Sequence, residues 1–241
     1  MLTVQKFGGS SVADAERIRR VARIVADTYD RGDDVVVVLS AQGDTTDEVL
    51  EKAVELSAAP GARVLDVLLT TGEQVSIALM AMCLEQMGYP VVSLTGWQAG
   101  IETGDTFGDA RIQRVDTERL LRYLRQHRIV VVAGYQGITA DGELTTLGRG
   151  GSDTTAVALA AALKADRCQI FTDVDGVYTA DPRKFSHAVK YEEITYDNML
   201  ALIADGAQVL HDRCVLLAKQ YGIEIEVLSS FERKPGTIVR G

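Results

Sequence analysis

The sequence predicts an α/β domain in which a mainly parallel sheet lies between helices. Three observations support this class. The chain has 241 residues, 46% of them hydrophobic, which suits one large domain, or one domain with two lobes. Apolar strand-like runs alternate with segments of helical spacing, and Gly-rich or Asp-rich turns separate them. Repeated strand–helix alternation is typical of a parallel sheet covered by helices.

The first half of the chain shows this alternation clearly. An N-terminal run of strand formers is followed by Ile18, Val21, Ala22 and Val25 at helical spacing. The unbroken apolar run at 35–39 is typical of a strand covered on both faces. The expected elements are strands at 2–7, 35–39, 89–94 and 129–133, a helix around 18–25, a helix from about 46, and a long helical stretch at 64–87 interrupted by Gly72.

The second half begins with an Asp-Gly turn between strand formers at 138–145, which predicts a hairpin. A glycine-rich stretch at 147–153 then precedes an alanine-rich helix at 154–163. The remaining expected elements are a strand at 168–172, a turn-rich segment at 173–183, helices at 197–204 and 208–221, and a strand at 223–228.

Charge and cysteine content exclude several function classes. The chain has 25 Lys and Arg against 34 Asp and Glu, a net charge of −9, which argues against a nucleic-acid or membrane-surface partner. We expect the three cysteines, Cys83, Cys168 and Cys214, to be reduced thiols rather than metal ligands or a disulfide framework. No signal peptide is evident, and no apolar run reaches the roughly 18 residues of a membrane helix. We therefore expect a cytoplasmic protein.

Two glycine-rich loops are candidates for anion binding. Residues 6–11 (KFGGSS) join the first strand to the first helix, where glycines, free helix N–H groups and the charge of Lys6 can receive an anion. An ordinary tight turn with a solvated lysine explains the same spacing equally well. The loop matches neither the P-loop nor the G-x-G-x-x-G fingerprint, so a Walker-type NTPase or a Rossmann dehydrogenase is not expected.

The second candidate loop is residues 148–155 (GRGGSDTT), where Arg149 can form a bidentate contact with a carboxylate. The alternative is a helix cap with an exposed arginine. Two anion-binding loops at one sheet suggest that a nucleotide phosphate meets an acidic substrate. A third segment, residues 172–183, lacks the ligand register of a calcium loop and is either a nucleotide clamp or a surface turn.

The chemistry expected at such a site needs no general base. His127, His187 and His211 fall in no triad context, and the sequence has no zinc-ligand spacing. A carboxylate nucleophile, with a pKa near ~4, is ionised at neutral pH. Phosphoryl transfer to it needs mainly positioning and charge neutralisation, which Lys6, backbone amides and Mg²⁺ can supply.

The motifs in order are KFGGSSV at 6–12, SA at 40–41, TTD at 45–47, TGE at 71–73, GRGGSDTT at 148–155, TDVDGVYTADPR at 172–183, SSF at 229–231 and PGT at 235–237. With these motifs the chain resembles, over nearly all its residues, the catalytic domain of aspartate kinases in the amino acid kinase family. Each motif alone is weak, whereas the ordered set is specific.

The resemblance implies ATP-dependent phosphorylation of the side-chain carboxylate of L-aspartate to 4-phospho-L-aspartate, with Mg²⁺, toward lysine, threonine and methionine. Two alternatives stay open: a kinase of another acidic amino acid or carboxylate, and a non-catalytic nucleotide-binding paralogue. We expect an amino-acid-substrate lobe at about 1–145 and an ATP lobe at about 146–241. A homodimer is implied as well, and a separate regulatory subunit is a further candidate partner.

The resemblance also implies roles for particular residues. No side chain is expected to act as a dedicated metal ligand. The implied residues are, for catalysis, Lys6 and Asp153; for aspartate, Ser40, Thr46, Glu73, Arg149, Gly150, Gly151 and Ser152; and for ATP, Lys6, Phe7, Gly8, Gly9, Ser10, Thr172, Asp173, Tyr178, Asp181, Arg183 and Gln208.

Two departures from the family pattern carry expectations. The run at 206–212 reads GAQVLHD, so Gln208 stands where the family commonly has a lysine that contacts ATP, and we expect weaker ATP binding. Aspartate kinases usually continue into regulatory ACT modules, whereas this chain ends at Gly241. The expectation is therefore no feedback inhibition by lysine or threonine from this chain alone.

Overall fold

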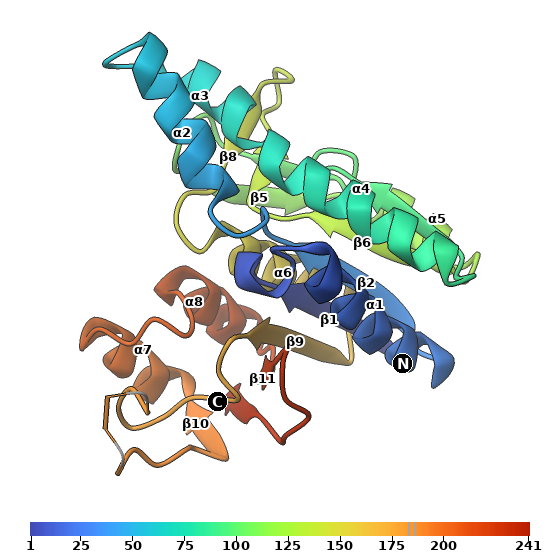
Figure 1. The fold of residues 1–241 in the computed structure, drawn as a ribbon, viewed down its shortest axis with the longest axis vertical. Helices are drawn as coiled ribbons and strands as arrows, with labels where there is room; N and C mark the ends of the chain where they lie inside the picture. The colour runs from blue at the N-terminus through green and yellow to red at the C-terminus, as the bar shows by residue number, and fades with distance from the viewer. Residues whose placement is uncertain (183, 186) are drawn as a thin grey trace.

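The computed structural model describes residues 1–182, 184–185 and 187–241, arranged around an eight-stranded sheet (Figure 1). The strand order is β10-β12-β11-β9-β1-β2-β6-β3, and every neighbouring pair is parallel except β11 with β12. This arrangement confirms the predicted α/β class. The strands are β1 (Leu2–Phe7), β2 (Asp34–Leu39), β3 (Val91–Leu94), β6 (Ile129–Ala133), β9 (Arg167–Thr172), β10 (Glu193–Thr195), β11 (Ile225–Ser229) and β12 (Thr237–Arg240).

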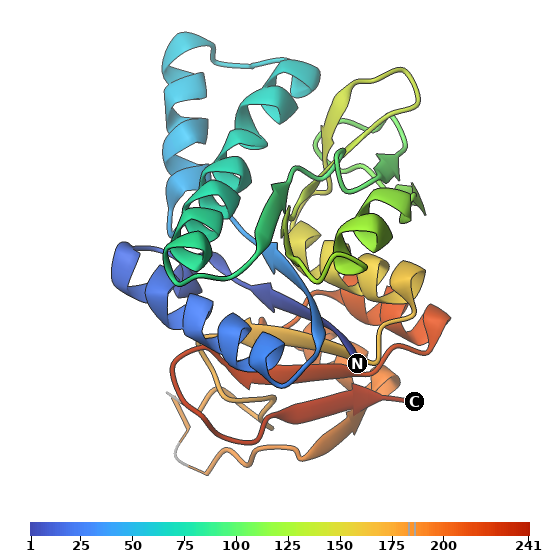
Figure 2. The ribbon, with the colours of Figure 1, turned by 90° about the vertical axis from the view of Figure 1, so that its right-hand side faces the viewer.

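Helices pack on both faces of this sheet (Figure 2). One face carries α5 (Glu118–Leu124), α6 (Gly151–Leu163), α7 (Tyr196–Ala204) and α8 (Asp212–Tyr221), and the other carries α1 (Ala15–Asp30) and α4 (Thr71–Gln86). Successive β2 side chains alternate between the two cores, so Val36 and Val38 lie in the first and Val35 and Val37 in the second. This explains the unbroken valine run, since both faces of β2 are buried.

A smaller, four-stranded sheet of order β5-β4-β7-β8 lies toward the end of the molecule that holds α2 and α3 (Figure 1). The antiparallel pair β7–β8 is the predicted hairpin, and Gly142 in its turn has φ +83°. The sequence patterns did not predict β4, β5, α5, β10 or β12, which are all short. The bounds are β4 (Ile101–Thr103), β5 (Ile112–Val115), β7 (Gln136–Ile138), β8 (Leu144–Thr146), α2 (Thr45–Leu56) and α3 (Ala62–Leu69).

The predicted helical stretch at 64–87 is two helices, and the prediction that Gly72 interrupts it was wrong. Thr70 separates α3 from α4, whereas Gly72 lies in the first turn of α4. A Cβ at Gly72 would lie 2.8 Å from the Cβ of Ala41. Glycine is therefore needed there for close packing against the loop after β2.

The structure also moves two helix starts. α6 begins at Gly151 rather than residue 154, so the glycine-rich loop provides its first turn. α8 begins at Asp212 rather than residue 208, because residues 207–211 form an irregular segment before it.

One helical stretch, Ala62–Gln86, is long and apolar enough to cross a membrane by length and composition, which differs from the expectation above. A single such stretch is a weak indication, since core helices pass the same test. Here it carries Asp66 and Glu73, both buried and hydrogen-bonded to backbone amides of this domain. We interpret it as a packing element of the domain.

Candidate active site

The site forms where the parallel strands end. β1, β2, β6 and β9 are adjacent and parallel, so their carboxyl ends meet at one edge of the sheet. The segments that leave this edge are residues 8–11, 40–43, 134–135 and the residues from 173 onward. Open α/β sheets bind ligands beyond this edge, as the sequence predicted for the first loop.

Lys6 and Asp153 join the two predicted anion-binding loops. The Lys6 Nζ lies 2.6 Å from Asp153 Oδ1, and the two side chains are only 12% and 8% exposed. Lys6 is on β1 and Asp153 is in the first turn of α6. A Cβ at Gly8 would lie 3.5 Å from Nζ, so the ammonium group also adjoins the first loop. The ion pair thus fixes a positive charge between the two loops.

The loop after β1 is closely packed at Gly9 and Phe7. Gly9 and Ser10 lie in a short 3-10 turn, Gly9–Ser11, that follows Gly8. A Cβ at Gly9 would lie 2.6 Å from the carbonyl oxygen of Ala41, so only glycine fits. The Phe7 side chain is fully buried and stacks on Phe171, with ring centroids 4.5 Å apart. Phe7 can therefore offer a ligand only its backbone.

Glu73 is a buried carboxylate, and one of its two oxygens has no hydrogen-bond partner among the described residues. Its side chain is 3% exposed; Oε1 accepts a hydrogen bond from the Ala41 amide at 3.1 Å, while Oε2 is buried without a hydrogen-bond partner among the described residues. Burial raises the pKa of Glu73 from 4.5 to about 7, although the amides of Glu73 and Ala41 oppose the shift. An unsatisfied buried acceptor is costly, so this oxygen fits a cationic donor from a ligand.

The other predicted acid-binding residues lie around the same edge. Ser40 follows β2 and precedes Ala41, and Thr46 is in the first turn of α2. Ser152 is buried at the start of α6, and a Cβ at Gly134 would lie 2.7 Å from its Oγ. Gly150 and Gly151 form the N-cap and first residue of α6.

Arg149 is presented outward from this loop. It lies between Gly148 and Gly150, both with φ +71°, and its side chain is exposed. It forms no ion pair with any residue in the described part of the chain. Its guanidinium is therefore available to a carboxylate ligand.

Tyr135 is a further candidate residue at this edge of the sheet, which the sequence patterns did not predict. It has φ +69°, an uncommon conformation for a residue with a side chain, and it directly follows Gly134 at the end of β6. Its ring lies 2.8 Å from where a Cβ would stand at Gly151. Burial raises the pKa of Tyr135, and the nearby charge of Glu73 raises it further. A hydrogen bond with Thr146 lowers this pKa in part. The carboxyl-end rule applied to the strand at 129–133 would have found it.

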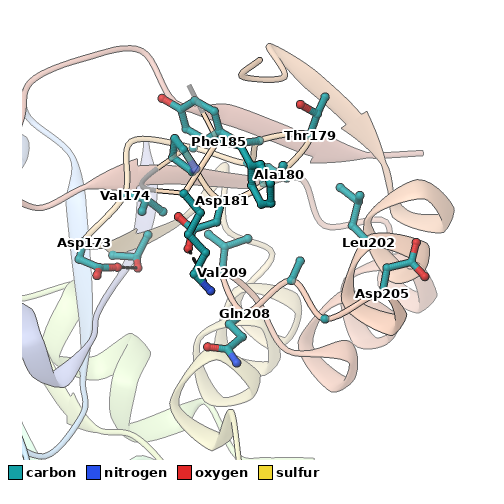
Figure 3. A pocket seen from close by; sticks show the side chains of 18 residues that line it. Asp173, Val174, Thr179, Ala180, Asp181, Phe185, Leu202, Asp205, Gln208 and Val209 are labelled. Carbon is teal, nitrogen blue, oxygen red and sulfur yellow. Dashed lines mark hydrogen bonds and ion pairs between the residues drawn. The ribbon is translucent and has the colours of Figure 1, made fainter. Parts of the chain in front are cut away.

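A cavity of about 850 Å³ adjoins the end of β9 (Figure 3). Five predicted ATP residues line it: Thr172, Asp173, Tyr178, Asp181 and Gln208. Arg183, also predicted, lies outside the described residues. Additional lining residues that the sequence reading did not single out include Val174, Lys184, Phe185, Leu202, Asp205 and Val209. The cavity lining does not include Lys6 or residues 7–10. Phe7 is paired in register with Phe171, the residue before Thr172 of the lining.

Part of the cavity wall is held by a small polar network. The Tyr178 hydroxyl donates to Asp175 Oδ1 at 2.6 Å, and Lys190 Nζ donates to Asp175 Oδ2 at 3.2 Å. The hydrogen bond from the Tyr178 hydroxyl to Asp175 raises the pKa of Tyr178 to about 12. Residues 175–178 are therefore held by fixed contacts, and the interpretation of this segment as a nucleotide clamp stays a prediction.

The described residues contain no group of three or more His, Cys, Asp or Glu side chains that could hold a metal ion. The three cysteines are free, and burial raises the pKa of Cys168 to about 12. His127 is exposed, whereas the ring of His211 lies directly beside Gly150 of the glycine-rich loop.

Comparison with known proteins gives the family. The sequence profile of the amino acid kinase family matches residues 1–229. The chain belongs to this family. An aspartokinase from Bacillus sp. (strain MGA3) is 58% identical over 238 residues, which cover 99% of this chain and 58% of that relative. The chain thus spans somewhat more than half the length of the curated family members it matches.

Solved structures of the family agree with the fold. An aspartate kinase from Synechocystis superposes with a TM-score of 0.90 and 48% identity, covering all of this chain and 40% of that one. E. coli aspartokinase III in complex with aspartate and ADP superposes with a TM-score of 0.89 and 30% identity, covering all of this chain and 65% of that one.

Proposed function

We propose that this chain transfers the γ-phosphoryl group of ATP to the side-chain carboxylate of L-aspartate, giving 4-phospho-L-aspartate and ADP. The observation that carries the proposal is the unpartnered Oε2 of Glu73 at the same sheet edge as the Lys6–Asp153 pair. A buried anionic acceptor there suits the ammonium group of a free amino acid. The similarity to E. coli aspartokinase III, solved with aspartate and ADP, supports the same substrates.

The amino acid is held at three points in this proposal. Glu73 accepts hydrogen bonds from the α-ammonium group. Arg149 binds the α-carboxylate through its exposed guanidinium, and Ser152 and the first amides of α6 help orient the substrate. The side-chain carboxylate is then the nucleophile, and it needs no base because it is ionised at neutral pH.

ATP lies in the cavity after β9, with its phosphates toward Gly8, Gly9 and Ser10. A substrate carboxylate oxygen bonds to the γ-phosphorus as the bond to the β–γ bridging oxygen breaks, and that oxygen leaves with ADP. Lys6 neutralises charge on the transferring group, and Asp153 orients Lys6. Mg²⁺ would be held mainly by the nucleotide phosphates, where it would supply further neutralisation of the charge on the transferring group.

The test is ADP release by the purified chain with Mg-ATP and L-aspartate, with hydroxylamine present to trap an acyl phosphate. Parallel reactions contain L-glutamate, N-acetyl-L-glutamate or no acceptor. Trapped product with aspartate alone is the expected result. Turnover with another acid would instead assign a different substrate, and nucleotide binding without turnover would contradict the kinase proposal.

Gln208 is expected to limit ATP affinity. It lines the nucleotide cavity and is exposed, so a lysine there would add a positive charge near the phosphates. Gln208→Lys should lower the KM for ATP by about 3–10-fold, the size of one partly exposed charge-assisted contact. Gln126→Lys, which adds the same charge at an exposed position after α5, is the matched control. An unchanged KM for ATP in Gln208→Lys would show that residue 208 does not contact the nucleotide.

We infer further that residues at about 1–145 form an amino-acid-substrate lobe and residues at about 146–241 an ATP lobe. The glycine-rich loop of the second lobe reaches the amino-acid site, and residues 6–10 of the first lobe reach the nucleotide phosphates. A cytoplasmic homodimer is the form proposed from the family resemblance. Light scattering of the purified chain across a range of concentrations measures its mass directly, and a monomer throughout would rule out the dimer.

A further inference from the structure

The N-terminus of α8 contacts the glycine-rich loop that carries Arg149. Arg213, in the first turn of α8, donates from Nη1 to the carbonyl oxygen of Leu147 at 2.6 Å. Its Nη2 forms an ion pair with Asp109, in the segment between β4 and β5. The Arg213 side chain is only 19% exposed. One guanidinium thus ties together the start of the loop, α8 and the smaller sheet.

The glycines on either side of Arg149 are closely packed as well. A Cβ at Gly148 would lie 2.5 Å from Asp109 Oδ1 and 3.5 Å from Arg213 Nη1. A Cβ at Gly150 would overlap the ring of His211, the residue before α8. The two glycines that flank Arg149 therefore lie directly against three side chains, those of Asp109, Arg213 and His211.

The residues that precede both partners of Arg213 are anchored by Asp66. This carboxylate on α3 is 1% exposed. Its Oδ2 accepts hydrogen bonds from the amides of Gly108 and Thr146, each at 2.9 Å, and its Oδ1 accepts one from Thr146 Oγ1 at 2.7 Å. Gly108 and Thr146 directly precede Asp109 and Leu147, so Arg213 binds two adjacent points of a fixed framework.

A loop with three glycines is costly to hold in one conformation, because glycine loses the most backbone freedom on ordering. Arg149 itself forms no ion pair with a described residue that would hold it. The loop is ordered by the hydrogen bond from the Gly151 amide to the Gly148 carbonyl oxygen at 3.0 Å, by α6, which begins at Gly151, and by the contacts at the start of the loop. The planar guanidinium of Arg213 is suited to this, since it can bind a carbonyl and a carboxylate at once.

We propose that Arg213 is a positioning residue that holds the glycine-rich loop so that Arg149 is presented to the substrate carboxylate. The claim rests on the proposed function for its kinetic consequence, because Arg149 is the group that binds the acid. Arg213 itself contacts neither substrate. The ion pair with Asp109 and the hydrogen bond to Leu147 are the two contacts through which it acts.

The kinetic test is Arg213→Met, with Arg114→Met as the matched control. Arg114 also pairs with an acid, Glu102, within the smaller sheet, but it is 63% exposed. Arg213→Met should raise the KM for L-aspartate about tenfold, because small misplacements of a binding group carry costs of this order. The dissociation constant for ADP should change by less than about twofold, as in Arg114→Met. Arg213→Lys keeps the positive charge but loses the planar guanidinium, which can make two contacts at once. Its KM for L-aspartate should therefore lie between those of wild type and Arg213→Met.

A second measurement does not depend on activity. Amide hydrogen exchange of the peptide covering residues 147–155 should be faster in Arg213→Met than in wild type or Arg114→Met. If wild type phosphorylates no acid, the proposed function fails while this measurement still tests the loop. Unchanged exchange and an unchanged KM for aspartate in folded Arg213→Met would overturn the inference.

Asp109→Asn tests the same proposal if Arg213→Met does not fold. Asp109 is 53% exposed, so losing its charge should leave the domain intact. Asp109→Asn should raise both the KM for aspartate and the amide exchange rate, as Arg213→Met does, but by a smaller factor of about three. No change in either quantity would contradict the role given to Arg213.

Discussion

Lys6→Ala is expected to lower kcat at least about 100-fold, a loss of roughly 3 kcal/mol in transition-state stabilisation. Lys6 is the cation at the junction of the two anion-binding loops, buried beside Asp153. Charge that develops on the transferring phosphoryl group would lose its nearest neutralising group. The KM for aspartate should change less, because Glu73 and Arg149 hold that substrate. Steady-state kinetics over both substrates give the two quantities separately.

The control for this variant must separate catalysis from folding. Removing Lys6 leaves Asp153 buried without its ion-pair partner, which itself can cost about 3–5 kcal/mol of stability. Thermal unfolding and ADP binding must therefore show that Lys6→Ala is folded before its kcat is interpreted. Lys219→Ala removes a lysine from a more exposed pair with Asp197 and should retain kcat. A folded Lys6→Ala within about fivefold of wild type, a loss of only ~1 kcal/mol, would remove Lys6 from the mechanism.

Glu73→Gln is expected to raise the KM for L-aspartate by about 10–100-fold, the size of a lost charge-assisted hydrogen bond to an ammonium group. In wild type the same KM should depend on pH. Because burial raises the pKa of Glu73 to about 7, the carboxylate that receives the ammonium is increasingly protonated below that pH. The KM for aspartate should therefore rise as pH falls from 8 to 6, and Glu73→Gln should lose this dependence.

The same substitution should stabilise the ligand-free protein. A glutamate whose folded pKa lies above its usual 4.5 binds more protons when folded, so its contribution to stability is lost as pH rises from about 4.5 to 7. At pH 8, Glu73→Gln removes the cost of a buried charge, on the order of 1–3 kcal/mol. Thermal unfolding at pH 5 and pH 8 tests the sign, since the gain in stability should be larger at pH 8 than at pH 5.

Glu55→Gln is the control for both measurements, because Glu55 is an exposed acid on α2. It should alter neither the KM for aspartate nor the pH dependence of unfolding. A Glu73→Gln protein with wild-type aspartate affinity at pH 8 would show that Glu73 does not bind the ammonium group. The proposed three-point binding of the amino acid would then be wrong.

The sequence alone determined the class of fold and the two loops of the site. The valine run of β2 predicts a strand buried on both faces, and the structure places it in the middle of the sheet. The glycines after β1 and before α6 mark loops by their local composition. These features could be predicted because hydrophobic periodicity and turn chemistry are properties of neighbouring residues.

Short elements and boundaries escaped the same reasoning. β4, β10 and β12 contain only three or four residues each, which is too few for a periodic pattern to stand out. The break at Thr70 has no glycine or proline to mark it, whereas Gly72 suggested a break and instead permits close packing on Ala41. Tertiary contact, rather than local preference, explains both positions.

Only the tertiary structure decided which residues meet. Lys6 and Asp153 are far apart in the chain, and their ion pair exists because β1 and α6 reach the same edge of the sheet. The unpartnered oxygen of Glu73 and the hydrogen bond from Arg213 to Leu147 likewise depend on how distant segments pack. Composition and periodicity describe segments, whereas burial, pKa shifts and bidentate contacts arise from distances that the folded topology sets.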